Sequence, residues 1–209
     1  MSDTVILTLN AGSSSIKFAV FEPGDEPALR ASGQVEKLSP SQQTRLIVET
    51  DGDSRASEID ANDHAGALGA ILGHAERLFG GATVVGVGHR VVHGGTDYTR
   101  PTLLQPDTIA ALRGLEPLAP LHQPHNLACV EAASAAFPDA LQIACFDTAF
   151  HRTHPFVNDT FALPRTWFDE GVRRYGFHGL SYDYITSEIA RTEPDLAAGR
   201  VVIAHLGNG

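Results

Sequence analysis

The spacing of apolar and polar residues divides the chain into two kinds of segment. In the first fifty residues, residues 5–9 form a short apolar run rich in β-branched side chains, which predicts a buried strand, and strands are also predicted at residues 16–21, 29–35 and 45–50. The small polar stretch from Asn10 to Ser15 separates the first two strands and predicts a hairpin with a glycine-serine tip. The charged and polar segment 51–60 predicts a surface turn.

From Asn62 onward the apolar residues fall at helical spacing, and helices then alternate with strands. Asn62 or Asp63 can cap the first helix, which Gly80-Gly81 would end. The pattern further predicts strands at 84–87, 141–146 and 201–206, and helices at 106–112, 126–137 and 181–191. This order predicts an α/β fold with a mixed sheet flanked by helices. Because domains normally end in exposed linkers, a stop at Gly209 directly after a strand indicates a piece of a longer protein.

Composition excludes several classes of protein. Hydrophobic residues make up 43% of the chain, enough for a packed core, and 15 Lys and Arg against 25 Asp and Glu give a net charge of −10. That balance argues against a nucleic-acid partner.

Cys129 and Cys145 lie in apolar surroundings, which favours two reduced thiols in a cytoplasmic protein over a disulfide. The first apolar run is broken by Asn10 and Gly12, so we expect neither a signal peptide nor a membrane partner.

The predicted hairpin tip is the first segment whose composition suggests chemistry. Residues 10–17 read Asn-Ala-Gly-Ser-Ser-Ser-Ile-Lys, and a tip of small residues offers backbone N–H groups and hydroxyls to a phosphate, with Lys17 on the adjoining strand. A Walker loop is excluded because its lysine follows a second glycine at the start of a helix. An ordinary hairpin explains the segment equally well.

Two charged residues follow apolar strands, where α/β sheets place their ligands. Arg90 lies in Gly-His-Arg-Val-Val-His-Gly-Gly and offers a planar fork to a carboxylate or phosphate, with a structural aspartate as the alternative partner. Asp147, in Phe-Asp-Thr-Ala-Phe-His, is either a functional carboxylate or a cap for the next element.

Two histidines stand in loops that present them. Three prolines stiffen the loop around His122, and the glycines that flank Phe177-His178 would let the backbone approach a ligand closely. Some histidines have the spacing of zinc ligands, but neither a cysteine pair nor a helical His-Glu-x-x-His supports zinc. The three pairs are His89/His93, His122/His125 and His151/His154.

Taken together, six segments resemble the signature segments of the acetate kinase family, in the same order and from Asn10 to Gly209. They are NAGSSSIKF, GHRVVHGG, PLAPLHQPHN, FDTAFH, YGFHGLS and HLGNG. The resemblance implies an actin-like ATPase (ribonuclease H-like) domain, the first part of a two-domain kinase. Residues 1–148 would form the bulk of the first domain, and residues 149–209 the connection and the start of the second, truncated at Gly209.

The resemblance also implies an activity, cofactors and partners. The full-length enzyme would transfer the γ-phosphoryl group of ATP to acetate, reversibly, giving acetyl phosphate and ADP. It would use Mg²⁺, which Mn²⁺ can replace. A cytoplasmic homodimer is expected, with no nucleic-acid or membrane partner.

Site roles follow from the same resemblance, position by position. Asn10 would help to hold the metal through its waters, and Arg90 would bind the acyl carboxylate. His122 and His178 would contact the transferring phosphoryl group, and Asp147 would act near the attacking carboxylate. The apolar acyl pocket would include Val92, Leu121 and Phe177, and the nucleotide phosphates would lie against Ser13, Ser15, Lys17, His205, Leu206, Gly207, Asn208 and Gly209.

Two alternatives remain open. Departures from the family pattern at Gln123-Pro124-His125 and at Leu180-Ser181-Tyr182 leave room for propionate or butyrate as the acceptor. One extra methylene changes binding by only about 1–3 kcal/mol, so the sequence does not separate these acids. A non-catalytic actin- or Hsp70-like nucleotide-binding module is the alternative from another class, but it has no use for a carboxylate-binding arginine beside an apolar pocket.

Overall fold

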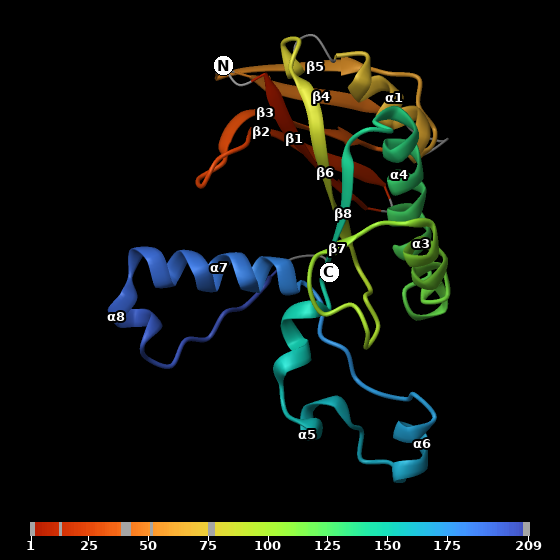
Figure 1. The fold of residues 1–209 in the computed structure, drawn as a ribbon, viewed down its shortest axis with the longest axis vertical. Coiled ribbons are helices and arrows are strands. Elements are labelled where there is room, and N and C mark those ends of the chain that lie inside the picture. Colours follow the sequence, from red (N-terminus) through yellow and green to blue (C-terminus); the bar gives the residue numbers. More distant parts are fainter. Residues whose placement is uncertain (1–2, 13, 39–42, 51, 75–77, 207–209) are drawn as a thin grey trace. The chain divides into compact units, whose positions relative to one another are not determined.

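The chain divides into two compact units. A computed structural model describes residues 3–12, 14–38, 43–50, 52–74 and 78–206 (Figure 1). One unit consists of Met1–Val91 with Pro101–Cys145, and the other of Val92–Arg100 with Phe146–Gly209. The predicted domain boundary after residue 148 stays a prediction.

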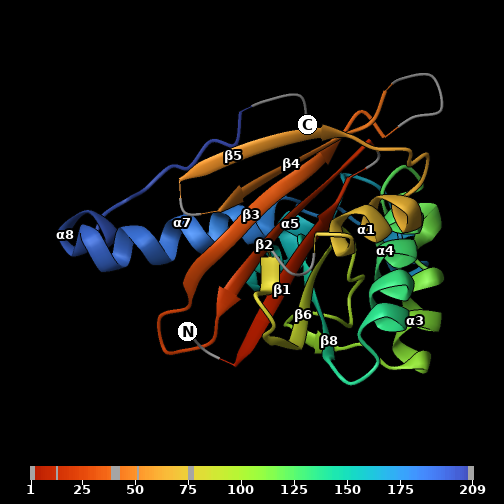
Figure 2. The same cartoon turned by 90° about the horizontal axis from the view of Figure 1, so that it is seen from above.

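The first unit is built on one mixed sheet of eight strands (Figure 2). Its strand order is β5-β4-β3-β2-β1-β6-β8-β7. The first five strands along the chain form an antiparallel meander, and β1 also pairs in parallel with β6. The strands are β1 (Thr4–Ala11), β2 (Ser15–Glu22), β3 (Ala28–Glu36), β4 (Arg45–Thr50), β5 (Asp53–Glu58), β6 (Thr83–Val91), β7 (Thr102–Leu103) and β8 (Leu141–Phe146). The predicted mixed α/β architecture is confirmed.

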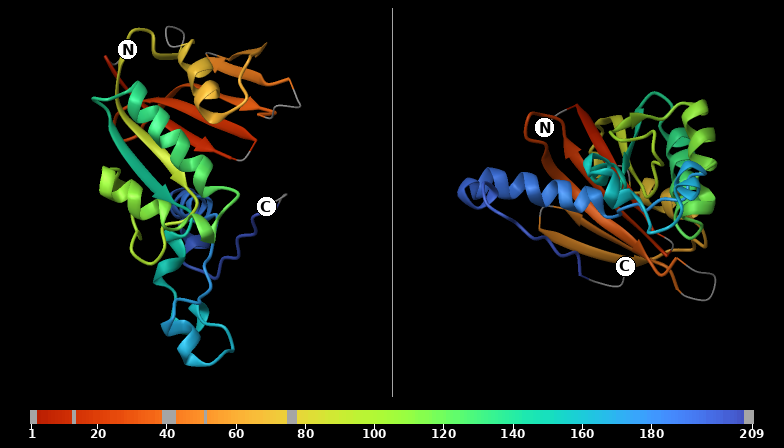
Figure 3. Two further views of the ribbon diagram at one scale, coloured as in Figure 1. Left: turned by 90° about the vertical axis from the view of Figure 1, so that its right-hand side faces the viewer. Right: turned by 90° about the horizontal axis from the view of Figure 1, so that it is seen from below.

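Three helices accompany this sheet on one side. The helix α4 (Gln123–Ala136) packs on β1 and β6, and α1 (His64–Leu72) and α3 (Pro106–Arg113) pack against α4 (Figure 3). Asp63 caps α1 by accepting a hydrogen bond from the Gly66 N–H at 2.7 Å, as one of the two predicted caps. Pro106 occupies the first turn of α3, where a missing N–H costs nothing.

Strict alternation along the central strands separates a core face from an open face. Along β1, Val5, Leu7 and Leu9 are buried with Ala11, and the residues between them are half-buried. Residues of β2 and β6 alternate in the same way. The buried face packs on the helices, so the half-buried and exposed side chains of these strands lie on the opposite face.

Three predictions from the pattern are wrong. Residues 53–58 form the strand β5 rather than a turn, because pairing with β4 satisfies the backbone while every β5 side chain stays exposed and leaves no alternation to read. The first helix ends at Leu72, where Gly73 is its C-cap, not at Gly80. Residues 201–206 form no strand, because a strand needs a hydrogen-bonded neighbour and the described residues provide none there.

The second unit is made of short helices joined by long loops. They are the 3₁₀ helix η2 (Ala149–Thr153), α5 (Phe156–Asp159), α6 (Arg165–Asp169), α7 (Gly179–Thr192) and α8 (Pro194–Ala197). The longest helices in the chain, α4 and α7, have 14 residues each. Within the described ranges, no helix has both the length and the apolar character needed to cross a membrane.

The close packing at Gly33 of β3 gives a stability test. A Cβ atom there would meet the ring of Phe18 and the backbone oxygen of Ile47, whereas a Cβ at Gly69, in the interior of α1, meets nothing within 4 Å. We expect Gly33→Ala to lower the free energy of unfolding by about 1–3 kcal/mol through overpacking. Gly69→Ala should raise it by about 0.5–1 kcal/mol, since alanine favours a helix. Urea unfolding measures both, and a Gly33→Ala protein as stable as the parent would contradict the packing at β3.

Candidate functional site

Alternation places three polar side chains together on the open face of the first unit's sheet. Asn10 lies near the end of β1 and pairs directly with Lys17 of β2, so the two side chains leave the sheet on the same side. Ser15 precedes Lys17 by two residues and shares its face. Lys17 is exposed, and Asn10 and Ser15 are half-buried. The hairpin tip therefore offers an amide, a hydroxyl and an ammonium group to an anion.

Arg90 joins this group from the neighbouring parallel strand. Leu9 pairs with His89, so Arg90 is brought level with Asn10, and its Nη1 donates a hydrogen bond to the Asn10 Oδ1 at 3.0 Å. Asn10 is therefore one hydrogen-bond partner of Arg90. This hydrogen bond orients the planar guanidinium, which has five N–H donors in a fixed fork.

His122 and Leu121 lie in the loop before α4, and both are exposed. His122 occupies the N-cap position of α4, and the helix therefore begins three residues earlier than predicted. Four residues predicted at the phosphate site, Ser13, Gly207, Asn208 and Gly209, lie outside the described residues.

Behind the hairpin tip, two side chains hold backbone oxygens. The Gly12 carbonyl oxygen lies 2.7 Å from His64 Nε2, and the Ala11 carbonyl oxygen accepts from Asn126 Nδ2 at 2.6 Å. Sequence reasoning missed both residues. The available signal was a histidine and an asparagine next to the apolar residues that these two helices bury.

His125 lies beside these contacts. Its ring stacks on that of His64 with a centroid distance of 4.7 Å. Burial lowers the pKa of His125, and the neighbouring His64 and His122 lower it further. A neutral His125 therefore packs against His64 without charge repulsion.

In the second unit, a backbone hydrogen bond connects Asp147 to Gly179, the residue that follows His178. Asp147 is 1% exposed, and its carbonyl oxygen accepts from the Gly179 N–H at 2.8 Å. His178 adopts the left-handed conformation, with φ 58° and ψ 22°, at the residue before α7. Such a conformation is strained for a residue with a Cβ and often marks a functional position. The imidazole of His178 stacks on that of His205 at 4.2 Å, with an angle of 6° between the rings.

The glycines of this segment approach other parts of the protein. A Cβ at Gly179 would meet the Asp147 backbone oxygen, and one at Gly176 would meet the ring of His151. The sequence predicted that these glycines let a ligand approach. That stays a prediction; in the structure, the glycines also allow close approach to the protein's own groups, which set the path of the backbone through Phe177 and His178.

Aromatic packing fixes the residues next to the predicted acyl pocket. His93 is 1% exposed, and its ring contacts those of Tyr175 at 4.4 Å and Phe177 at 5.8 Å. Burial lowers the pKa of His93, and its Nδ1 accepts from the Gly95 N–H at 2.9 Å, so the neutral ring carries its proton on Nε2. Val92 is buried, while Leu121 belongs to the other unit. A pocket formed by Val92, Leu121 and Phe177 stays a prediction.

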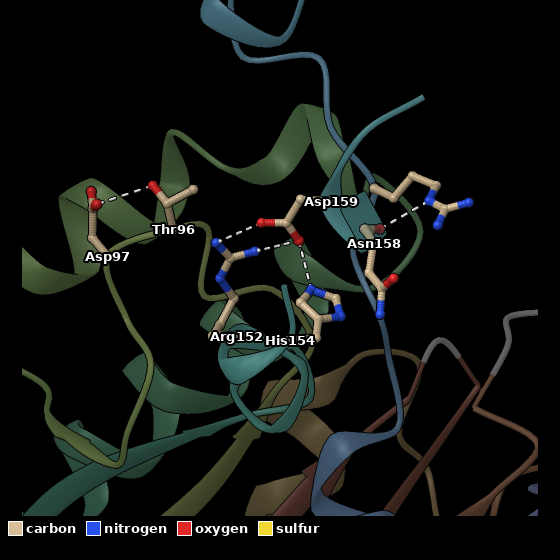
Figure 4. A network of polar contacts seen from close by, with 7 residues as sticks. Thr96, Asp97, Arg152, His154, Asn158 and Asp159 are labelled. Carbon is tan, nitrogen blue, oxygen red and sulfur yellow. Dashed lines mark hydrogen bonds and ion pairs between the residues drawn. The ribbon is translucent and has the colours of Figure 1, made fainter. Parts of the chain in front are cut away.

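A buried ionic network anchors the loop between η2 and α6 (Figure 4). Asp159 accepts from His154 Nε2 at 2.6 Å and lies 3.3 Å from Arg152 Nη2. The Asp159 backbone oxygen also accepts from the Arg174 N–H at 2.8 Å. His154, one of the histidines with ligand-like spacing, thus serves an ion pair. In the described part of the chain, no three His, Cys, Asp or Glu side chains gather where they could hold a metal.

Fold and site together define the class. The mixed sheet with a polar hairpin tip and an arginine at the end of the adjoining parallel strand is the actin-like ATPase fold. The chain belongs to the acetokinase family, whose family model matches residues 5–209.

Individual relatives agree with this assignment. The chain is 50% identical over 98% of its length to the acetate kinase of Methylocella silvestris and 46% identical over its whole length to that of Rhodopseudomonas palustris. It spans about half of these relatives, 53% and 54% respectively. The crystal structure of Porphyromonas gingivalis acetate kinase matches 90% of the chain with a TM-score of 0.79 and 34% identity. The crystal structure of a propionate kinase from Francisella tularensis matches the chain with a TM-score of 0.81 and 28% identity. The chain covers 48% of each of these two structures.

Because the backbone at His178 is left-handed, glycine should be more stable than alanine at this position, which is the reverse of their order inside a helix. We expect His178→Gly to be more stable than His178→Ala by about 1–2 kcal/mol, because only the alanine retains the strain. At Tyr184, exposed within α7, the alanine variant should instead be more stable than the glycine variant by about 1 kcal/mol. Denaturant unfolding of the four variants measures this, and the same order at both positions would refute a left-handed His178.

Proposed function

We propose that the full-length protein transfers the γ-phosphoryl group of ATP to acetate, reversibly, giving acetyl phosphate and ADP. Membership of the acetokinase family and several relatives named acetate kinase support this proposal. The observation that carries it is the Arg90–Asn10 contact beside Lys17, which gathers a guanidinium, an amide and an ammonium group on one open sheet face. A nucleotide-binding module without catalysis does not account for a guanidinium held in this way.

The reaction sets two physical requirements. Acetate is already an anion at neutral pH, so it needs no general base to become a nucleophile. It must be aligned with a phosphoryl group that repels it, and the charge of a loose phosphoryl transition state must be neutralised. Preformed donors satisfy both requirements best, because they do not reorganise during the reaction.

Residues of the first unit answer these requirements in the proposed mechanism. Arg90 binds the acetate carboxylate through its fork, and the hydrogen bond to Asn10 fixes the plane of the guanidinium. Lys17 and the hydroxyl groups of Ser13 and Ser15 bind the nucleotide phosphates. His122, exposed before α4, donates to the transferring phosphoryl group.

Residues of the second unit complete the proposed set. His178 donates to the phosphoryl group from its left-handed position, and a neutral imidazole can serve as the donor. Asp147 orients the site and is not itself phosphorylated, so transfer is direct and in line. The loop from His205 to Gly209 begins a second phosphate site. Val92, Leu121 and Phe177 bind the methyl group of acetate.

The cofactors follow from this chemistry. ATP carries the phosphoryl group, and bound Mg²⁺ would neutralise charge on the phosphates. Among the described residues, Asn10 has the kind of oxygen ligand that Mg²⁺ binds. Its Oδ1 accepts one hydrogen bond from Arg90 and keeps a second lone pair. Mg²⁺ retains several waters and binds mainly through substrate phosphates, so a cage of protein carboxylates is not required. We further propose a cytoplasmic homodimer.

Acyl phosphate formation by the full-length enzyme tests the function. ATP, Mg²⁺ and hydroxylamine would be incubated with acetate, propionate or butyrate, and the hydroxamates measured. We expect kcat/KM to be highest with acetate. A maximum with propionate would favour the activity named for the Francisella tularensis structure, and no hydroxamate with any of the three acids would refute carboxylate kinase activity.

Replacement of Arg90 by lysine tests its proposed contact with the carboxylate. Lysine keeps the charge but loses the two-pronged geometry, so we expect Arg90→Lys to lower kcat/KM for acetate by about 10²–10³-fold, with the nucleotide Kd nearly unchanged. The matched control is Arg113→Lys, which replaces an exposed arginine paired with Glu131 in the same unit and should leave the kinetics unchanged. Equal kinetics in the two variants would contradict the role of Arg90.

A further inference from the structure

Two buried side chains hold the hairpin tip from the side opposite to its phosphate-binding groups. His64 Nε2 lies 2.7 Å from the Gly12 oxygen, and Asn126 Nδ2 lies 2.6 Å from the Ala11 oxygen. The two side chains come from α1 and α4, and their residues are only 6% and 1% exposed. They reach the tip across 52 and 115 residues of sequence. The proposed mechanism above makes no use of either residue.

The direction of these bonds matters for an anion site. A backbone oxygen carries partial negative charge, so a tip that binds phosphate must hold its carbonyl groups away from the anion. The Gly12 N–H donates to the Ser15 oxygen at 2.8 Å and closes the hairpin. The oxygens of Ala11 and Gly12 are taken by the helix side chains behind the sheet. Without those donors, the two carbonyl groups would lose these hydrogen bonds, and rotation of their peptide planes would relieve the cost.

We infer that His64 and Asn126 are positioning residues that orient the hairpin-tip peptides for the nucleotide phosphates. This inference rests on the proposed function, since it assigns those phosphates to the tip. Because the Gly12 oxygen can only accept, His64 acts as the donor and carries its proton on Nε2. The stacked ring of His125 limits rotation of the His64 ring.

The chain provides a matched control for the loss of a buried bond to a carbonyl group. Thr44 is 2% exposed, and its hydroxyl donates to the Ala61 oxygen at 2.8 Å in the same unit. The Thr44 bond therefore resembles those of His64 and Asn126 in burial and acceptor, but its acceptor lies outside the hairpin tip. Thr44→Val removes a bond of this kind without changing the carbonyl groups of Ala11 and Gly12.

The test compares steady-state kinetics and melting temperatures of full-length variants. We expect His64→Leu and Asn126→Leu each to lower kcat/KM for MgATP by about 10–100-fold, because small misplacements at a reacting centre are costly, while KM for acetate changes less than about twofold. His64→Gln retains a donor and should recover most of the loss. Thr44→Val should lower Tm to a similar extent and leave kcat/KM unchanged. Asn126→Asp, which keeps the shape but removes the donor, should behave like Asn126→Leu and serves if the leucine variants do not fold.

A binding measurement separates this inference from the proposed function. Calorimetry would compare the Kd of a non-hydrolysable ATP analogue with Mg²⁺ and the Kd of adenosine. Weaker binding of the analogue with unchanged binding of adenosine supports the role of His64 and Asn126, even if the wild-type enzyme forms no acyl phosphate and the proposed function fails. Unchanged binding of the analogue would overturn it. It would also be overturned if the His64 and Asn126 variants, at the same loss of Tm as Thr44→Val, kept an unchanged kcat/KM as that control does.

Discussion

Parallel pairing of β1 with β6 is the interaction on which the site of the first unit depends. The register that places Leu9 against His89 brings Asn10 level with Arg90 and turns both away from the core. A slip of one residue would bury Arg90 and expose His89. A buried contact opposes such a slip, because His89 Nε2 lies 2.8 Å from Gln142 Oε1 on β8. Burial lowers the pKa of His89, and this effect outweighs the hydrogen bond to Gln142, which raises it. A neutral histidine is thus compatible with the core, while the Arg90 side chain lies on the open face.

Each unit uses its buried polar groups to set the backbone of a functional segment. At the hairpin tip, His64 and Asn126 hold carbonyl groups on the core side while Asn10, Ser15 and Lys17 occupy the other face. In the second unit, the Gly179 N–H bonds the Asp147 oxygen and His178 stays in a left-handed conformation. Polar contacts of this kind cost little when all their partners are matched and allow one geometry to persist. The side chains proposed for chemistry are then presented by a backbone that has few alternatives.

Most of the fold could be predicted because its signals are local. A run rich in β-branched residues marked β1, the polar turns between apolar segments separated it from β2, β3 and β4, and Asp63 and Pro106 marked helix starts. The strand β5 was not predicted because both of its faces are exposed, so its sequence shows neither alternation nor apolar character. Residues 201–206 have the composition of a strand, but strand formation depends on a neighbouring strand, which composition does not reveal. The actin-like fold and the family were indicated by six short segments, and the structure and the family match confirm both.

The sequence by itself determined the candidate chemistry: an amide, a lysine and an arginine at strand ends, two loop histidines and a buried aspartate. Residue type and spacing suffice for this, because the donor or acceptor character of a side chain does not depend on the fold. Only the tertiary structure decided how these groups are held. One partner of Arg90 is an asparagine 80 residues away, and partners of the Ala11 and Gly12 oxygens lie on two helices distant in sequence. The flanking glycines serve close packing within the protein. Such contacts join residues that no local pattern connects, since they arise only when sheet register and helix packing bring distant segments within hydrogen-bonding distance.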